Sequence, residues 1–479
     1  MLLAAPLFLP SAHAQKAAPV PAPATSFRPA PLFSPSQVNV QTLPNGVRGL
    51  VKAAGGSDVV NIQVWVRAGS RYESDRESGA AHLLEILALR GSKTYPAARG
   101  GDDDNGGAAG ALRALGGEAG SLSSRDSTFF STTVAAPYAA RALQILADAV
   151  ARPDLSDAAI EDAKMRASDD IARRAFDPVA SASDLAYATA FSRHPYRRSA
   201  LGSDASVASL SPAAVRDYFR KHYVGANVSV VVVGQIPTAQ AQKLIAQDFA
   251  PLSAAKLPAL KLATEAPLKT DVVARRRPVG REVIDLAWRS PGINKPDDCV
   301  AIDVLLALWS EGADANLRTL LMRDGENGPR QPLADAFDVD FLTQRDAGLF
   351  IISLTGPSDR DGAVNAVLGE LKRVRDGGVS ASELQRAKTQ LTQQYIEQGE
   401  NVAGQGGSLG FYDMISSYRF ALEYLDRIAR ITNADLQRVT KQYLAPDRYL
   451  RAEILPLPRP RPDTEGESPV ITAGWNRNR

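Results

Sequence analysis

The sequence predicts an α+β fold with two homologous domains, each an antiparallel sheet covered by helices. A unit of a helix, a Lys-x-Tyr triplet, a turn and a strand occurs at 211–233 and again, about one domain length later, at 432–455. Strands and helices are mixed along both halves, and 120–134 is typical of a hairpin, which favours helices layered on an antiparallel sheet. The 479 residues, 44% of them hydrophobic, are enough for two cores.

In the first half, the alternating segment 59–66 predicts the opening strand, and a helix containing His82 follows it. Towards the end of this half, Ser211 precedes a proline and apolar residues at helical spacing, so it is the expected cap of a helix that leads to Tyr223. The β-branched run 228–233 then predicts the closing strand.

The second half repeats this order. Residues 282–288 predict its opening strand, and an apolar helix follows over 302–308. Thr432 is the expected cap of the last helix, and 449–455 predicts the closing strand. Cys299 is the single cysteine, which excludes an intrachain disulfide, and its apolar neighbours predict a buried thiol.

Composition sets the boundaries of these units. The N-terminal apolar run ends in Ala12-x-Ala14, which is typical of a secretory signal peptide. The following stretch is rich in Ala and Pro and predicts an extended tether. The expected organisation is a signal peptide at 1–14, a tether at 15–36, a first domain at 37–250, a linker at 251–270, a second domain at 271–455 and a disordered tail at 456–479.

Charge and hydropathy exclude two classes of function. A formal net charge of +2 gives no electrostatic footprint for nucleic acid. After the leader, no apolar run approaches the roughly 20 residues needed to span a bilayer. The signal peptide therefore predicts a periplasmic or secreted protein without a membrane span.

The helix that contains His82 carries most of a zinc-peptidase motif. In an H-x-x-E-H motif the two histidines lie one helical turn apart and bind the same zinc ion, and the glutamate polarises the bound water. His82 and Glu85 occupy the first and fourth positions, but Ile86 stands where the second histidine belongs. An apolar side chain at that position cannot bind metal.

Around this helix the chain resembles the insulinase-like, or mitochondrial-processing-peptidase-like, zinc peptidases of family M16, as a member that lacks the full zinc motif. The resemblance implies two facing α+β domains that enclose a chamber, with the zinc helix on its wall. It rests on ordered motifs at 43–46, 68–73, 79–87, 115–118, 124–128, 194–196, 201–202 and 223–234.

The resemblance also implies a third metal ligand, a glutamate on a helix roughly eighty residues beyond the first histidine. Asp170 stands at that position, with a side chain one methylene shorter. Two of the three metal positions, at 86 and 170, are therefore altered. Because a complete zinc site contributes on the order of 10–16 kcal/mol over four ligands, the loss of one imidazole alone should weaken metal binding about a hundredfold.

Two positions correspond to substrate contacts of the family. The family's edge strand G-G-x-x-N-A matches 116–121, and Gly120 takes the place of the asparagine. A glycine there either still admits a peptide backbone or leaves a loosened edge strand without a ligand. The family's R-G-L-A-Y matches 331–335, where Asp335 replaces the tyrosine; Arg330 is then either the substrate-contacting arginine or a solvated loop cation.

Three hypotheses about function follow. The first is a pseudoenzyme, not active on its own, that forms a heterodimer with an active zinc-peptidase homologue and helps to build the peptide-binding chamber. This hypothesis requires no cofactor. The alternative is an active zinc metallopeptidase with an altered ligand set, which would need zinc. The third is a stand-alone scaffold that binds peptides.

Overall fold

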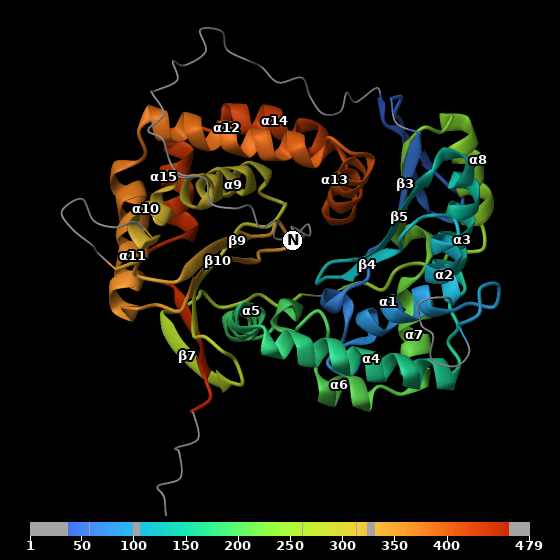
Figure 1. The fold of residues 1–479 in the computed structure, drawn as a ribbon, viewed down its shortest axis with the longest axis horizontal. Helices are drawn as coiled ribbons and strands as arrows, with labels where there is room; N and C mark the ends of the chain where they lie inside the picture. The colour runs from blue at the N-terminus through green and yellow to red at the C-terminus, as the bar shows by residue number, and fades with distance from the viewer. Residues whose placement is uncertain are drawn as a thin grey trace, which may run out of the picture.

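The computed structural model describes residues 37–56, 58–98, 106–260, 262–312, 314–322 and 331–458. The expected signal peptide at 1–14, the expected tether at 15–36 and the expected tail beyond 458 lie outside the described residues. The described chain forms two halves, and each is a sheet with helices on its outer face (Figure 1). The prediction of an α+β fold with two similar halves is confirmed.

Each half contains one sheet. The first is six-stranded, in the order β1-β2-β6-β3-β5-β4, and the second is five-stranded, in the order β7-β11-β8-β10-β9. The strands are β1 (Asn39–Thr42), β2 (Arg48–Ala53), β3 (Val59–Val66), β4 (Gly120–Ser123), β5 (Thr128–Ala135), β6 (Val228–Gly234), β7 (Asp271–Arg277), β8 (Val283–Arg289), β9 (Ala336–Phe341), β10 (Leu349–Thr355) and β11 (Leu450–Pro456).

The two sheets share one topology, which supports the internal duplication. The order β2-β6-β3-β5-β4 in the first half corresponds to β7-β11-β8-β10-β9 in the second, and β1 is an additional edge strand. The sheets are not wholly antiparallel, because β2 pairs with β6, and β7 with β11, in parallel. The closing strand of each half inserts beside the opening strands and runs antiparallel to β3 or β8, which leaves it parallel to its other neighbour.

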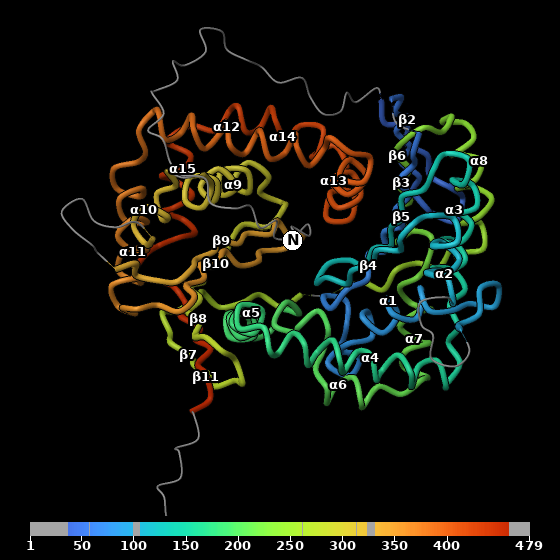
Figure 2. The backbone as a smooth tube through the Cα atoms, viewed as in Figure 1, coloured from blue at the N-terminus to red at the C-terminus, as the bar shows by residue number. Residues whose placement is uncertain are grey.

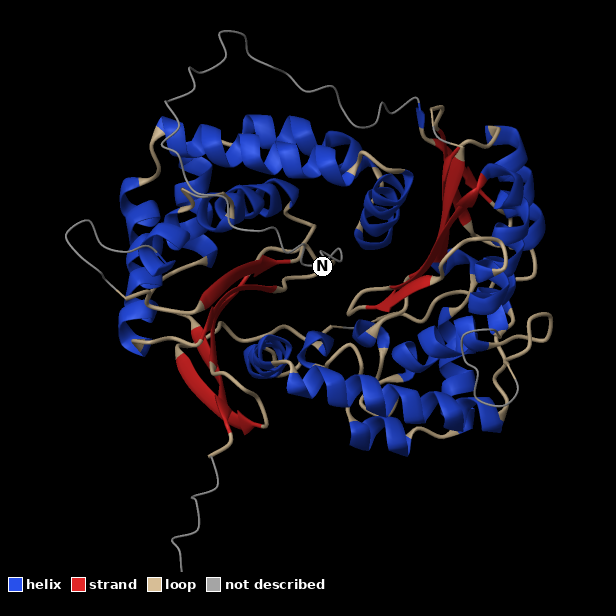
Figure 3. Cartoon of the chain, in the orientation of Figure 1, coloured by secondary structure: helices blue, strands red, loops and turns tan. Residues whose placement is uncertain are grey.

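Helices cover the outer faces of the sheets, as the blue helices and red strands of Figure 3 show. Ser211 and Thr432 cap α7 and α15 as predicted, each accepting a hydrogen bond from a backbone N–H three residues later. Cys299 is buried, also as predicted. The helices are α1 (Ala80–Arg90), α2 (Gly107–Arg113), α3 (Ala139–Ala151), α4 (Asp157–Phe176), α5 (Pro178–Ala190), α6 (Asp204–Ser209), α7 (Pro212–His222), α8 (Thr238–Asp248), α9 (Pro296–Ser310), α10 (Asn316–Met322), α11 (Arg360–Gly377), α12 (Ala381–Gln398), α13 (Val402–Ile415), α14 (Arg419–Arg430) and α15 (Asn433–Tyr443).

The halves exchange one helix each. Helix α13, from the second half, packs on β3 and β6 of the first sheet, and α5, from the first half, packs on β8 and β11 of the second. The backbone trace shows both helices between the two sheets (Figure 2). Apolar residues of both halves fill the two contacts. Leu409 belongs to one buried cluster with Val231 and Trp65, and Leu185 belongs to another with Ala287 and Leu450. Each sheet is therefore covered on both faces only when both halves are present.

The contact between α13 and β3 depends on glycine. A Cβ atom at Gly406 would lie 2.6 Å from the Asn61 side-chain oxygen, and one at Gly410 would overlap the Trp65 ring. Glycine in a helix costs about 1 kcal/mol relative to alanine, so the close approach of the two backbones must offset that cost. The polar side chains of β3 meet this helix, since Gln63 donates a 3.0 Å hydrogen bond to the carbonyl of Ala403.

Candidate functional site

A buried carboxylate fixes the start of α1, the helix that carries the zinc-motif residues. Glu73 accepts hydrogen bonds from the backbone N–H groups of Gly79, at 3.0 Å, and Ala81, at 2.9 Å. Gly79 has a φ of 97°, a conformation that glycine adopts without strain. Burial raises the pKa of Glu73 to about 7, against the opposing effect of these two hydrogen bonds. The orphan N–H groups at the helix N-terminus thus have an internal acceptor.

His82 lies on the first turn of α1 between two carboxylates. Its Nδ1 is 3.1 Å from an oxygen of Glu85, and its Nε2 is 3.1 Å from an oxygen of Asp170 on α4. The residue is only 5% exposed. Burial by itself would lower the pKa of His82, but the hydrogen bond and charge of Glu85, followed by those of Asp170, outweigh it and raise the pKa. The structure thus brings together three predicted site residues: His82 and Glu85 on α1, and Asp170 on α4.

The other oxygens of the two carboxylates are engaged as well. Glu85 accepts a 2.9 Å hydrogen bond from the hydroxyl of Ser121, which joins α1 to the edge strand β4. Asp170 forms an ion pair with Arg173, one turn further along α4. The His82 cluster, defined here as His82, Glu85 and Asp170, is therefore a hydrogen-bonded network that satisfies its own charges.

The side chains present do not fit a three-ligand zinc site. Ile86, at the position of the second histidine, is half-buried and packs against the hydrophobic core of the first half. One imidazole and one carboxylate remain as possible ligands, whereas a catalytic zinc site uses three protein ligands and a water. No group of three or more His, Cys, Asp or Glu side chains with an arrangement suited to a metal ion occurs among the residues that the structure describes.

Of the two predicted substrate positions, Gly120 lies within the described residues and Arg330 does not. Gly120 is the first residue of β4, at the edge of the first sheet, and pairs with Ser131 of β5. Arg330 lies outside the described residues. Asp335, at the position of the family's tyrosine, accepts a 2.8 Å hydrogen bond from Arg281 and precedes β9, the edge strand of the second sheet.

Three of the motif fragments meet at the junction of the halves, a role that the sequence did not indicate. Arg71, from the fragment 68–73, donates a 2.6 Å hydrogen bond to Asp346, which lies in the loop between β9 and β10 of the second half. His194 lies 3.2 Å from the same Asp346 oxygen through its Nε2. Although burial opposes it, these two partners lower the pKa of Asp346 to about 2.

The same junction holds a second buried carboxylate. Asp126 accepts hydrogen bonds of 2.7 and 2.8 Å from the hydroxyl of Tyr196 and one of 2.9 Å from the backbone N–H of Arg345 in the second half. Burial raises the pKa of Asp126. We call Arg71, Asp126, His194, Tyr196 and Asp346 the junction network. In the sequence, the one sign of this network was that charged and aromatic residues occur in motifs that have no part in zinc chemistry.

The fold and the site together define a zinc-peptidase-like scaffold in which the metal positions are altered. The chain belongs to peptidase family M16. The family profile described as insulinase (peptidase family M16) matches residues 50–204, and the profile described as the peptidase M16 inactive domain matches residues 209–391.

The individual relatives and structures are distant in sequence, and some of them match over most of the chain. The chain is 23% identical to the mitochondrial-processing peptidase subunit beta of Dictyostelium discoideum over 419 residues, 85% of this chain and 86% of the relative. It is 27% identical to cytochrome b-c1 complex subunit 1 of Bos taurus over 226 residues, 46% of this chain and 44% of the relative. The crystal structure of a protease from Helicobacter pylori superposes with a TM-score of 0.79 at 19% identity, covering 88% of this chain and 99% of that one.

Proposed function

We propose that this protein is a catalytically silent subunit that pairs with an active M16 zinc peptidase and contributes one wall of the chamber in which peptide is held. The observation that carries the proposal is the His82 cluster. Ile86 fills the place of a zinc ligand, and both ring nitrogens of His82 are already engaged by carboxylates. The rest of the two-half scaffold is intact around this altered site.

The relatives support a role within an assembly. The Dictyostelium protein is named as a subunit of a processing peptidase, and the bovine protein is named as a subunit of the cytochrome b-c1 complex. A chain with this fold that lacks zinc ligands still offers a large surface for a homologous partner. We expect that interface to be of at least standard size, roughly 800 Å² per partner.

A cavity in the second half supports contact with peptide. It has a volume of about 210 Å³ and is lined by side chains that include Phe341, Tyr395, Phe411 and Tyr412. Asp303 is also part of the lining and accepts a 2.6 Å hydrogen bond from the hydroxyl of Tyr424. An aromatic wall with a few polar atoms suits one apolar or aromatic side chain of a bound peptide.

Co-expression with an active homologue that carries an intact H-x-x-E-H motif tests the proposal. Peptide cleavage is compared for the active subunit alone, with this chain, and with its Glu85→Gln form. We expect co-elution on a sizing column, faster cleavage by the pair, and no effect of Glu85→Gln, because no zinc-bound water depends on that carboxylate.

A matched pair of glycine variants separates the role of the scaffold from that of the site. Gly410→Ala forces α13 away from β3, whereas Gly369→Ala on α11 meets open space. Only the first should reduce cleavage by the pair. Equal rates for the active subunit with and without this chain, together with separate elution, would refute the proposal and leave a stand-alone peptide-binding protein. Chelator-sensitive cleavage by this chain alone, with equimolar zinc, would instead favour the altered-ligand peptidase.

We also propose export to the periplasm or the medium, based on the apolar run at 1–14. None of the described helices is long and apolar enough to cross a membrane. N-terminal sequencing of the native protein tests the export signal: a mature chain that begins at Gln15 is expected, and one that retains residues 1–14 would contradict it.

A further inference from the structure

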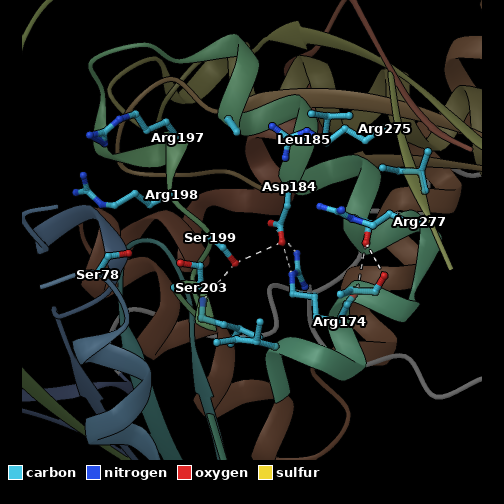
Figure 4. Close-up of a pocket in the computed structure, with 17 residues that line it drawn as sticks. Ser78, Arg174, Asp184, Leu185, Arg197, Arg198, Ser199, Ser203, Arg275 and Arg277 are labelled. Carbon is cyan, nitrogen blue, oxygen red and sulfur yellow. Dashed lines mark hydrogen bonds and ion pairs between the residues drawn. The ribbon is translucent and has the colours of Figure 1, made fainter. Parts of the chain in front are cut away.

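A second cavity lies at the junction of the halves, apart from the His82 cluster. It has a volume of about 370 Å³. One wall comes from α4, α5 and the turn at 197–203 of the first half, and the other comes from β7 and β11 of the second. Figure 4 shows the side chains that line it. The volume falls within the range typical of small-molecule sites, and a ligand held there would touch both halves.

The walls of this cavity are rich in arginine. Five arginines and a single acidic residue, Asp184, line it. Asp184 is already engaged, since Arg174 donates hydrogen bonds of 2.6 and 3.0 Å to its two oxygens and the Ser199 hydroxyl donates a third at 3.3 Å. Arg197 and Arg198 extend away from Asp184 in Figure 4 and pair with Asp75.

Two of the arginines have no counter-charge. Arg275 and Arg277 lie two residues apart on β7, so their side chains leave the same face of the strand about 7 Å apart. In Figure 4 both extend towards Asp184. Within the described part of the chain, neither guanidinium has a hydrogen-bond or ion-pair partner. The intervening Arg276 points to the opposite face and donates a 3.0 Å hydrogen bond to the carbonyl of Pro456.

We propose that this cavity binds a small molecule bearing a phosphate group, with Arg275 and Arg277 as its principal contacts. Among the residues that line the cavity, the guanidinium groups of Arg174, Arg275 and Arg277 surround the single carboxylate of Asp184, a formal excess of two positive charges that matches a phosphate dianion better than a single carboxylate. Arg125, outside the lining, adds a further cation at 3.5 Å from Asp184. Guanidinium groups also present paired N–H donors that suit phosphate oxygens. The hydroxyl of Ser203, in the turn that lines the cavity, provides a further donor. The inference is independent of the proposed pairing with an active peptidase.

Calorimetric titration of the full-length protein with inorganic phosphate and with pyrophosphate, at constant ionic strength, tests the site. We expect saturable binding of both anions and tighter binding of pyrophosphate, whose charge is larger. The double variant Arg275→Gln/Arg277→Gln should weaken binding at least about tenfold, because it removes both charge-assisted contacts. Arg276→Gln is the matched control: it removes one cation from the same strand but not from the cavity, and binding should stay unchanged.

Thermal unfolding without ligand shows whether the variants remain folded, and all three residues lie on an edge strand where such substitutions are tolerated. Equal binding by the wild type and the double variant would overturn the proposal, as would a heat signal that never saturates. Binding of a glutamate-rich peptide that is lost in the double variant, with no binding of pyrophosphate, would also overturn it, because the site would then recognise carboxylates of a peptide.

Discussion

Restoring the two altered metal positions should create a zinc site in this protein. The double variant Ile86→His/Asp170→Glu places a second imidazole four residues after His82, on the same face of α1, and lengthens the carboxylate that approaches from α4. The two helices that carry these positions are already in contact, and Asp170 lies 3.1 Å from the His82 ring. We therefore expect the variant to bind zinc and the unmodified protein to bind it weakly.

The expected gain follows from the number of ligands. A complete zinc site contributes about 10–16 kcal/mol over four ligands, or roughly 3 kcal/mol for each. The hydrogen bonds that His82 makes now would be lost when it binds zinc, and this loss opposes the gain from the added imidazole. A hydrogen bond with one charged partner contributes about 1.5–3 kcal/mol, and less where the carboxylate is partly exposed, as at Asp170. The longer carboxylate recovers part of this, so the net expectation is affinity about a hundredfold higher.

Zinc content by mass spectrometry and competition with a chelating dye measure this gain. Ile86→Gln with Asp170→Glu is the matched control, since glutamine introduces a polar side chain of similar length without an imidazole. A double variant that binds zinc no more tightly than this control would show that the imidazole at position 86 adds nothing to metal affinity, and the ligand argument would fail.

Three further outcomes are expected. Arg71→Met removes the guanidinium that pairs with Asp346 and leaves His194 as the remaining partner of that carboxylate at the junction. The free energy of unfolding should fall by about 2–3 kcal/mol in urea titrations, less than for a fully buried pair because Asp346 is partly exposed, and a loss below about 0.5 kcal/mol would contradict this. Asp285 is buried, and burial raises its pKa to about 8, so the folded state keeps a proton that the unfolded state releases above about pH 4. This one group should lower stability by up to about 1.4 kcal/mol per pH unit between pH 5 and 7, and Asp285→Asn should reduce the measured slope by that amount, whereas an unchanged slope would contradict it. Gly410→Ala should destabilise the protein by about 1–3 kcal/mol through overpacking, whereas Gly369→Ala should be neutral or slightly stabilising; equal effects would show that close packing of α13 is unimportant.

The strands and the duplication could be predicted because they are encoded locally. The alternation over 59–66 coincides with β3, and the two capped helices begin where Ser211 and Thr432 indicate. What covers the polar face of β3 could not be predicted. Asn61 and Gln63, at 2% and 4% exposure, are buried beneath a helix that comes from the other half of the chain.

Helix α13 itself shows why local signals fail at this contact. Residues 402–415 contain four glycines, a composition that disfavours an isolated helix. The helix is stable because two of these glycines, Gly406 and Gly410, let it approach the sheet closely, where Gln63 and Trp65 meet it. The stabilising contact is with residues more than three hundred positions away, so no window of sequence contains both sides of it.

The candidate site divides in the same way. The spacing of His82 and Glu85 on one helix is local, and the position of Asp170 came from the resemblance; the structure brings these side chains together. The junction network could not be derived, because Arg71, Asp126 and Tyr196 stand in separate motifs and acquire a common role only when the second half supplies Arg345 and Asp346.

The arrangement of these contacts explains how the metal positions can be altered without loss of the fold. The halves are held together by the exchanged helices α5 and α13 and by the junction network, and none of these contacts includes the His82 cluster. The cluster replaces metal bonds with hydrogen bonds between its own side chains, so no buried charge is left unpaired there. The residues that hold the halves together are thus separate from those at the metal positions. The contacts between the halves therefore stay intact although Ile86 stands at one metal position and Asp170 at another.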